Sequence, residues 1–240
     1  MELKNLLIKW GCMLIPNTLK RKIITDSREN AIEIFSQEGE DKLLERFIGK
    51  KHFGIYVDVG AHHPTFLSNT YYFYKQGWRG INIDATPGAM KLFDKIRPYD
   101  INIEQPIANQ SSELEFHIFS APELNTFDKV KVAEFLTYPK VILKKKIKLN
   151  TVKLERILEE NLLKLGNPQI DFLTVDVEGM DIEVLKSNNW QKYRPLFILV
   201  EDISSNILES KDNEVGVFMS SVGYTLKAKT LNTLFFQRNS

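Results

Sequence analysis

Acidic residues and a glycine turn follow short apolar segments in this sequence. Asp58 and Gly60 end the segment 54–60, and Asp84 ends the segment 80–84, 84 − 58 = 26 residues after Asp58. In nucleoside-binding α/β proteins, a glycine turn lets the backbone approach the ligand, and an acid about 20 residues later accepts hydrogen bonds from ribose hydroxyls. The pair therefore indicates a nucleoside site. A second role for Asp84 is also open, namely to stabilise the N-terminus of the helix that follows.

No phosphate-binding motif accompanies the glycine turn. G-x-G-x-x-G would need glycines where His62 and Thr65 stand, and G-x-x-x-x-G-K-[ST] does not occur. A glycine turn and a ribose acid without a phosphate loop favour a nucleoside ligand that carries no phosphates. S-adenosylmethionine (SAM) is such a ligand, and its ammonium and sulfonium charges suit a site surrounded by acids.

Asp176 and Glu178 stand at the end of the apolar segment 170–177 and could act on a bound hydroxyl. Alternate residues of an extended strand point to the same side, so both carboxylates can face one crevice. A hydroxyl is a weak nucleophile that must lose its proton, and we expect one of these carboxylates to be the general base. His63, with an unperturbed pKa of about 6.5, is a second candidate, although it could equally cap a helix.

The acids at two predicted strand ends could also bind a metal ion. Asp176 and Glu178, together with Glu201 and Asp202, would supply the oxygen ligands that Mg²⁺ prefers. Their spacing is not specific to one ion, and acids at strand ends also balance helix N-termini. We therefore predict no metal site.

The segments that carry these residues must be strands of one sheet. They are apolar throughout and alternate with segments of helical spacing, as expected when helices cover both faces of a parallel sheet. The sequence predicts strands at 54–60, 80–84, 101–108, 113–119, 170–177 and 196–202, and helices at 38–48, 66–76, 87–96, 154–165 and 214–221, with one more helix ending at 185. Strands 224–229 and 231–238 would form an antiparallel hairpin at the C-terminal edge. The prediction is a doubly wound α/β sheet, in which ligands bind beyond the carboxyl ends of the strands.

The middle of the chain mixes helical and loop signals. Residues 121–141 are predicted to be an insertion that shapes the substrate pocket, because long irregular segments over a scaffold carry specificity. Residues 144–146 are three lysines inside a β-like run. We interpret them as the guard of an exposed edge strand, and an anion site is the alternative.

Composition excludes several classes of protein. Of the 240 residues, 43% are hydrophobic and 26% charged, as in ordinary globular proteins. The 32 basic and 31 acidic residues leave a net charge of +1, so no global field attracts nucleic acid or an anionic membrane. Cys12 is the one cysteine, which excludes a disulfide-stapled scaffold and indicates a reducing compartment.

The N-terminus is predicted to be a helical arm, residues 1–35, before one domain, residues 36–240. Residues 6–15 are fairly apolar, but Pro16 ends them before the about 20 residues that a membrane helix needs, and no signal-peptide pattern is present. We therefore expect a cytoplasmic protein without a transmembrane segment. The basic stretch 20–22 leaves a peripheral membrane contact open.

Several segments resemble, in order, those of the FkbM family of SAM-dependent methyltransferases, over about residues 30–240. The matching segments are Ser36–Asp41, Tyr56–Ala61, Leu67–Thr70, Gly77–Asp84, Ile170–Gly179 and Phe197–Glu201. Two departures are the His62-His63 pair and the segment 84–87, where the family often has a glutamate followed directly by proline. The resemblance implies a Rossmann-like, seven-stranded methyltransferase sheet with SAM as cofactor. It also implies methyl transfer to a hydroxyl oxygen of a sugar, polysaccharide precursor or natural product.

The resemblance further implies a set of cofactor-binding residues. They are Gln37, Asp58, Gly60, Ala61, Ser68, Asn69, Thr70, Asp84, Ala85, Thr86, Ala108 and Asn109. Residues 58–61 would lie beneath the methionine end of SAM, 84–86 beside the ribose, and 108–109 near the adenine. Residues 68–70 would hold the carboxylate of SAM or the substrate, unless they cap a helix. Gln37, together with Asp41, would cover the cofactor, unless the two are a solvated helix start.

Two other functions compete with hydroxyl methylation. One is a metal-dependent glycosyltransferase, in which Asp176 and Glu178 would hold the metal and a nucleotide-sugar; Gly60 and Asp84 argue against it. The other is a protein that binds SAM without turnover. A nucleic-acid methyltransferase is disfavoured, because the net charge is near zero and no Asn/Asp-Pro-Pro-aromatic motif is present to grip a flipped base. The expected partner is a small-molecule or glycan hydroxyl acceptor, and the oligomeric state is left open.

Overall fold

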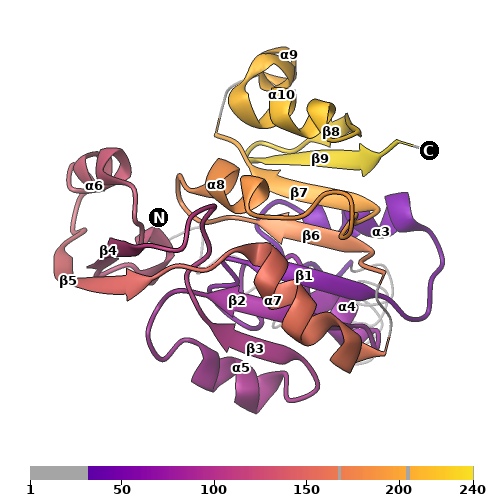
Figure 1. Cartoon of the computed structure of the whole chain (residues 1–240), viewed down its shortest axis with the longest axis horizontal. Coiled ribbons are helices and arrows are strands. Elements are labelled where there is room, and N and C mark those ends of the chain that lie inside the picture. Colours follow the sequence, from indigo (N-terminus) through magenta and orange to yellow (C-terminus); the bar gives the residue numbers. More distant parts are fainter. Residues whose placement is uncertain (1–31, 167–168, 204–205, 240) are drawn as a thin grey trace, which may run out of the picture. The chain divides into compact units, whose positions relative to one another are not determined.

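The computed structural model describes residues 32–166, 169–203 and 206–239. Seven strands form one sheet in the order β3-β2-β1-β6-β7-β9-β8 (Figure 1). The first five run parallel, and β9 runs antiparallel between β7 and β8. The strands are β1 (Ile55–Val59), β2 (Arg79–Asp84), β3 (Ile101–Glu104), β6 (Phe172–Val175), β7 (Phe197–Glu201), β8 (Tyr224–Lys229) and β9 (Thr233–Arg238). The predicted Rossmann-like sheet with its antiparallel C-terminal hairpin is confirmed.

Helices cover both faces of this sheet, and the alternation of side chains along β1 shows how. Tyr56 packs in a cluster with Leu44 of α3 and Phe73 of α4. Its neighbour Val57 points to the other face and packs in the cluster that contains Leu154 of α7. The helices are α3 (Glu40–Ile48), α4 (Tyr71–Lys75), α5 (Met90–Ile96), α7 (Leu154–Asn161), α8 (Asp181–Lys186), α9 (Ile207–Asp212) and α10 (Glu214–Ser221), with the 3-10 turn η2 (Leu162–Leu165) after α7.

Between β3 and α7 the chain leaves the sheet and forms a lobe, which comprises residues 113–150. Its two strands, β4 (Glu113–Phe119) and β5 (Leu143–Asn150), pair antiparallel in a sheet of their own. The 3-10 turn η1 (Pro122–Leu124) and helix α6 (Lys129–Phe135) connect them. The lobe stands beside the main sheet in Figure 1. The two ends of the lobe lie side by side, where the N–H of Thr151 donates to the carbonyl oxygen of Ser112 at 2.9 Å.

Three predicted elements differ from the structure. The segment 113–119 is a strand, but it pairs within the lobe rather than in the main sheet. The third strand ends at Glu104 instead of residue 108, because Pro106 has no N–H to continue the ladder. The helix predicted from residue 66 begins only at Tyr71, since Leu67 adopts a left-handed φ of 50° that no helix accepts.

The predicted N-terminal arm, residues 1–35, lies almost entirely outside the described residues, as do Cys12 and the basic stretch 20–22. From Phe35 onward the chain forms one compact unit that carries the sheet and the lobe. Among the helices of the described ranges, none combines the length and the apolar character needed to cross a membrane.

Candidate functional site

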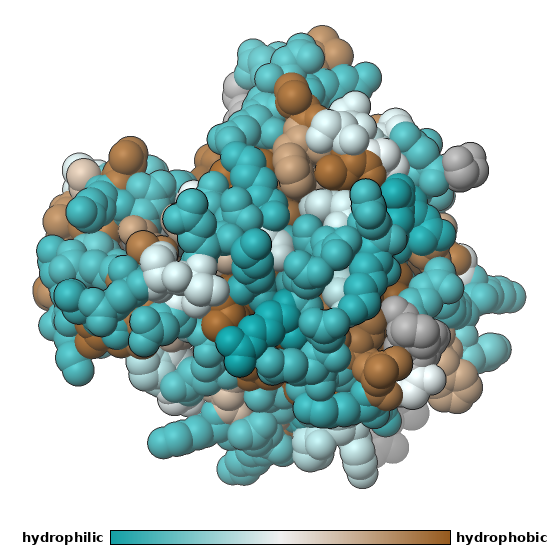
Figure 2. Space-filling model, viewed as in Figure 1, coloured by the Kyte–Doolittle hydropathy of each residue, from teal (hydrophilic) through white to brown (hydrophobic). Residues whose placement is uncertain are grey.

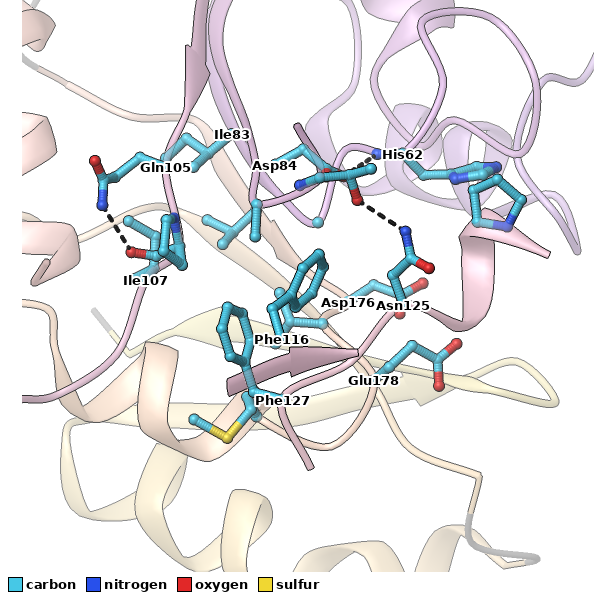
Figure 3. Close-up of a pocket in the computed structure, with 18 of the residues that line it drawn as sticks. His62, Ile83, Asp84, Gln105, Ile107, Phe116, Asn125, Phe127, Asp176 and Glu178 are labelled. Atoms are coloured by element: carbon cyan, nitrogen blue, oxygen red, sulfur yellow. Dashed lines mark hydrogen bonds between the residues drawn. The ribbon is translucent and has the colours of Figure 1, made fainter. Parts of the chain in front are cut away.

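A pocket lies at the carboxyl ends of β1, β2 and β6 (Figure 3). The loop after β3 and the lobe complete its walls. From β1 the sheet continues through β2 to β3 on one side, and from β6 it continues to β7 on the other side, so the strand order reverses between β1 and β6. In α/β sheets such a switch point opens a crevice in which ligands bind. The lining residues labelled in Figure 3 are His62, Ile83, Asp84, Gln105, Ile107, Phe116, Asn125, Phe127, Asp176 and Glu178.

Gly60 forms the turn at the end of β1 and lines the pocket. Its φ is 86°, in the left-handed region that favours glycine. A Cβ at this position would lie 1.7 Å from the carbonyl oxygen of Asp176 on the neighbouring segment. The turn therefore needs glycine both for its backbone conformation and for its closeness to the end of β6.

The Asp84 carboxylate is fixed to the pocket wall by two backbone groups. Oδ2 accepts from the N–H of His62 at 2.9 Å, and Oδ1 accepts from the N–H of Thr86 at 2.7 Å. Each oxygen keeps a further lone pair for a ligand hydroxyl. Helix α5 begins only at Met90, so Asp84 is too far from the helix to stabilise its N-terminus. Asp84 instead holds the loop that precedes the helix. Ala85 and Thr86 line the pocket beside it, as the ribose assignment expects.

Asp58 and Ala61 lie behind the pocket wall rather than in it. Asp58 is 6% exposed, and its Oδ2 accepts from the hydroxyl of Thr70 at 2.7 Å. Burial raises the pKa of Asp58 to about 6, against the lowering effect of the Thr70 hydrogen bond and of Arg97. Ala61 is buried in a small cluster with Met90 and Phe93 of α5.

Arg97 organises the loop that follows the glycine turn, and sequence reasoning missed it. Its side chain is completely buried. Nε donates to the carbonyl oxygen of Pro64 at 2.7 Å, Nη2 to the hydroxyl of Ser68 at 2.7 Å, and Nη1 to the hydroxyl of Thr70 at 2.8 Å. Nothing in the sequence marks this arginine, because arginines are rarely buried. Its three contacts fix the loop 61–70 from behind.

The predicted group 68–70 is therefore divided between two positions, neither of which lines the pocket. Ser68 and Thr70 are buried under Arg97, 2% and 0% exposed. Asn69 is partly buried, and its amide donates to the hydroxyl of Thr174 at 3.0 Å, which links the loop to β6. The Ser68 hydroxyl also accepts from the N–H of Tyr71 at 3.2 Å, at the start of α4, as the capping alternative expects.

The two histidines of the turn separate. His62 lines the pocket and has a φ of 50°. His63 does not line it: its Nδ1 accepts from the N–H of Thr65 at 3.2 Å and from the N–H of Phe66 at 3.0 Å. Burial lowers the pKa of His63, and the charges of His62 and Arg97 lower it further. His63 therefore holds the bend at residues 64–67, since no helix begins there and α4 starts only at Tyr71.

An apolar slot occupies the part of the pocket between β2, the loop after β3 and the lobe. The rings of Phe116 and Phe127 lie 4.5 Å apart at an angle of 37°. Ile83, Pro106 and Ile107 face the same space, and these surfaces suit a planar heterocycle. Ala108 and Asn109, the predicted adenine neighbours, are not among the lining residues. Residues 105–107 take that place, because β3 ends earlier than the apolar run suggested.

Two carboxylates, Asp176 and Glu178, line another part of the pocket, and Glu201 lies beside them. One oxygen each of Asp176, Glu178 and Glu201 lie within 4.8 Å of one another. The Asp176 side chain is exposed to the pocket, but it stands on the floor of the cleft, where desolvation and then the charge of Glu201 raise its pKa well above the ordinary range. Burial raises the pKa of Glu178 to about 7, although Lys131 lowers it, and burial and Glu178 raise the pKa of Glu201 to about 8. Such a group can share protons, or its oxygens can hold a divalent cation.

The segment that carries Glu178 is clamped by the lobe. The hydroxyl of Thr126 donates to the carbonyl oxygen of Glu178 at 2.7 Å. Glu178 itself has a φ of 52°, unusual for a residue with a side chain. A Cβ on the next residue, Gly179, would lie 2.7 Å from Oδ2 of Asp128, at the start of α6. The lobe and the acidic segment are therefore packed without space between them.

The predicted cover of the cofactor by the N-terminal helix has no counterpart among the pocket-lining residues. Gln37 is exposed and lies outside the pocket lining. Asp41 is buried and accepts from the N–H of Phe35 at 2.8 Å and the hydroxyl of Ser36 at 2.9 Å. Asp41 thus organises the start of α3.

The comparisons with known proteins agree with this geometry. A family model, the methyltransferase FkbM domain, matches residues 58–226. The chain belongs to the FkbM methyltransferase family. The match includes Gly60, Asp84 and the acidic group at the ends of β6 and β7, and S-adenosylmethionine is the cofactor of this methyltransferase. A search of curated proteins gave no significant match.

Two solved structures are similar to the chain of this FkbM methyltransferase. One is a TehB-like SAM-dependent methyltransferase from Corynebacterium glutamicum, with 10% identity and a TM-score of 0.43 over 92% of this chain and 97% of that one. The other is precorrin-6y C5,15-methyltransferase from Geobacter metallireducens, with 9% identity and a TM-score of 0.43 over 88% and 93%. At this level of similarity they add nothing to the assignment.

The pocket fits SAM on its own chemistry. The tight Gly60 turn allows a ligand to approach the backbone. Asp84, with a lone pair left on each oxygen, suits a ribose diol, and the slot beside Phe116 suits an adenine ring. The acidic group suits the positive charge of the methionine end.

Proposed function

We propose that this methyltransferase methylates a hydroxyl oxygen of a sugar, polysaccharide precursor or natural product. The observation that supports the proposal best is the group of carboxylates at the pocket: Figure 3 shows Asp176 and Glu178 in the same pocket as Asp84, and Glu201 lies close to both. A hydroxyl must lose its proton to become a good nucleophile, and a carboxylate whose pKa is raised toward neutrality is suited to take it.

Glu178 is the residue to which we assign the proton. Its pKa of about 7 means that near neutral pH it is partly ionised and still basic enough to accept a proton from a hydroxyl. Asp176 and Glu201 lie close to it, so a second carboxylate can take over the proton. The bound SAM supplies the electrophilic methyl group, and alignment of the hydroxyl with that methyl provides most of the remaining rate.

The lobe contributes to both sides of the pocket in this proposal, because Phe116 and Phe127 belong to it and line the slot for the adenine. Residues 60, 84–86 and 105–107 hold the nucleoside and the methionine end. The lobe, through Pro122, Glu123 and Asn125, closes the side that the acceptor enters. The prediction that residues 121–141 shape the acceptor pocket becomes part of this proposal.

The experiment that tests the proposal measures binding before turnover. Calorimetric titration with S-adenosylhomocysteine should show micromolar binding, and a panel of sugars and polyhydroxylated acceptors with radiolabelled SAM should identify a methyl ether product. Cofactor binding with methylation confined to amines or carbon atoms would contradict hydroxyl methylation. Binding of a nucleotide-sugar in place of S-adenosylhomocysteine would revive the glycosyltransferase alternative. Cofactor binding without any product across the panel would favour the protein that binds SAM without turnover.

A further inference from the structure

The outer end of the lobe exposes apolar side chains. Val130 is 76% exposed, Ile142 63%, Leu136 51% and Tyr138 41%. All four belong to α6 and the loop that leads to β5. Figure 2 shows hydrophobic side chains at the rim of this lobe, among hydrophilic ones. Apolar side chains gathered within so short a stretch mark a surface of contact.

The same stretch is strongly basic. Residues 129–146, called the tip below, contain six lysines and one acid, Glu134. Lys146 pairs with Glu115 of β4. Four other lysines of the tip are exposed and form no ion pair with any described residue: Lys129, Lys140, Lys144 and Lys145. Although the whole chain has a net charge of only +1, its positive charge is concentrated here.

We propose that the tip docks on an anionic membrane surface. Lysines next to an anionic bilayer each add to the attraction, and aliphatic side chains between them enter the boundary between headgroups and acyl chains. A nucleic acid would be gripped instead by aromatic rings that stack on bases. Tyr138 is the one exposed aromatic residue of the tip, and its hydroxyl is already bonded to Glu134 at 2.7 Å. The aliphatic side chains therefore favour the membrane.

The tip is continuous with the acceptor side of the pocket. Asp128, which caps α6, packs against Gly179, and Thr126 holds the backbone of Glu178. Docking of the tip brings the mouth of the pocket to the membrane surface. If the proposed function holds, the acceptor hydroxyl belongs to a lipid headgroup or to a glycan attached to a lipid.

The experiment is sedimentation of the full chain with vesicles, without cofactor or acceptor. The wild type should bind vesicles that contain phosphatidylglycerol, bind pure phosphatidylcholine weakly, and dissociate as salt screens the charges. The variant Lys144→Gln/Lys145→Gln should lower the partition coefficient about 25-fold, and Ile142→Ser should lower it further. The matched controls on α5, Lys91→Gln/Lys95→Gln and Leu92→Ser, also change exposed residues and should bind as the wild type does.

Equal binding by the tip variants and the wild type, as expected if the basic stretch 20–22 mediates the contact, would overturn the proposal. Binding of duplex RNA that depends on Lys144 and Lys145, without binding to vesicles, would also overturn it. Should a variant fold poorly, a second readout uses Cys12→Ser/Ile142→Cys labelled with an environment-sensitive dye. Its emission should shift to the blue on anionic vesicles, and the same label at Leu92→Cys should not respond. Titration of the same preparations with S-adenosylhomocysteine shows separately whether the methyltransferase site is intact.

Discussion

The wall around Asp84 and the carboxylates around Asp176 face the same pocket but differ in how their polar groups are satisfied. Asp84 accepts two backbone hydrogen bonds, and the loop behind it is held by the buried guanidinium of Arg97. Among the described residues, no protein group donates to the side chains of Asp176, Glu178 or Glu201, and their pKa values are raised. A rigid wall whose polar groups already have hydrogen-bond partners suits a ligand that does not vary, such as a cofactor. A set of carboxylates without donors suits proton transfer and varied acceptors.

The largest expected effect comes from Gly60, which both regions share. Gly60→Ala places a Cβ against the carbonyl oxygen of Asp176 and should prevent stable folding or lower the melting temperature by more than 10 degrees, because a backbone clash of this size costs several kcal/mol. Gly88→Ala is the matched control: its φ is also 86°, but nothing lies within 4 Å of the added Cβ. Equal melting temperatures for the two variants would show that the Gly60 contact is not tight.

On the side without donors, Glu178→Gln should lower kcat about 100- to 10,000-fold while the affinity for S-adenosylhomocysteine is unchanged, because a proton acceptor is lost and the shape is kept. Since the base acts in its ionised form and its pKa is raised to about 7, wild-type activity should rise with pH through that value and then level off. Glu113→Gln, which changes an exposed glutamate of the lobe outside the pocket lining, is the control. Full activity of Glu178→Gln would move the base to Asp176 or Glu201.

On the satisfied side, Arg97→Met should lower the free energy of unfolding by about 3 kcal/mol and weaken binding of S-adenosylhomocysteine. The variant removes the donor to the carbonyl oxygen of Pro64 and the guanidinium hydrogen bonds to the hydroxyls of Ser68 and Thr70 and to the amide oxygen of Asn82. Chemical denaturation and calorimetry measure the two effects. Arg156→Met removes a guanidinium from the exposed side of α7 and should change neither. Arg97→Met with wild-type affinity would show that the loop does not need this support.

The smallest expected effect is that of Asp84→Asn. Losing one charged acceptor beside the ribose should weaken the binding free energy of S-adenosylhomocysteine by about 1–3 kcal/mol. The fold should hold, because the amide oxygen of asparagine can still accept one backbone hydrogen bond. Asp94→Asn, on the exposed side of α5, is the control for the lost charge. Unchanged affinity would place the ribose elsewhere in the pocket.

The sequence predicted the strand ends well, because a fully covered parallel strand must be apolar over its length and Asp58, Asp84 and Asp176 interrupt such runs. It did not predict the sheet to which residues 113–119 belong. A strand with one covered face shows the same alternation of side chains whichever sheet it joins. Arg97 was missed because its burial depends on loop carbonyls and hydroxyls that come from another part of the chain. The contacts at residues 105–107 were missed because one proline ended a strand early.

The ends of the lobe meet at Ser112 and Thr151, so the whole excursion occupies no more of the scaffold than a short loop would. An insertion of this kind is a cassette: its length and surface can be exchanged without separating any two strands of the main sheet. The walls that the lobe supplies, from Phe116 to Phe127, can therefore change while Gly60, Asp84 and Arg97 stay as they are. In this architecture the framework fixes the glycine turn and Asp84, and the cassette can adjust the rest of the pocket.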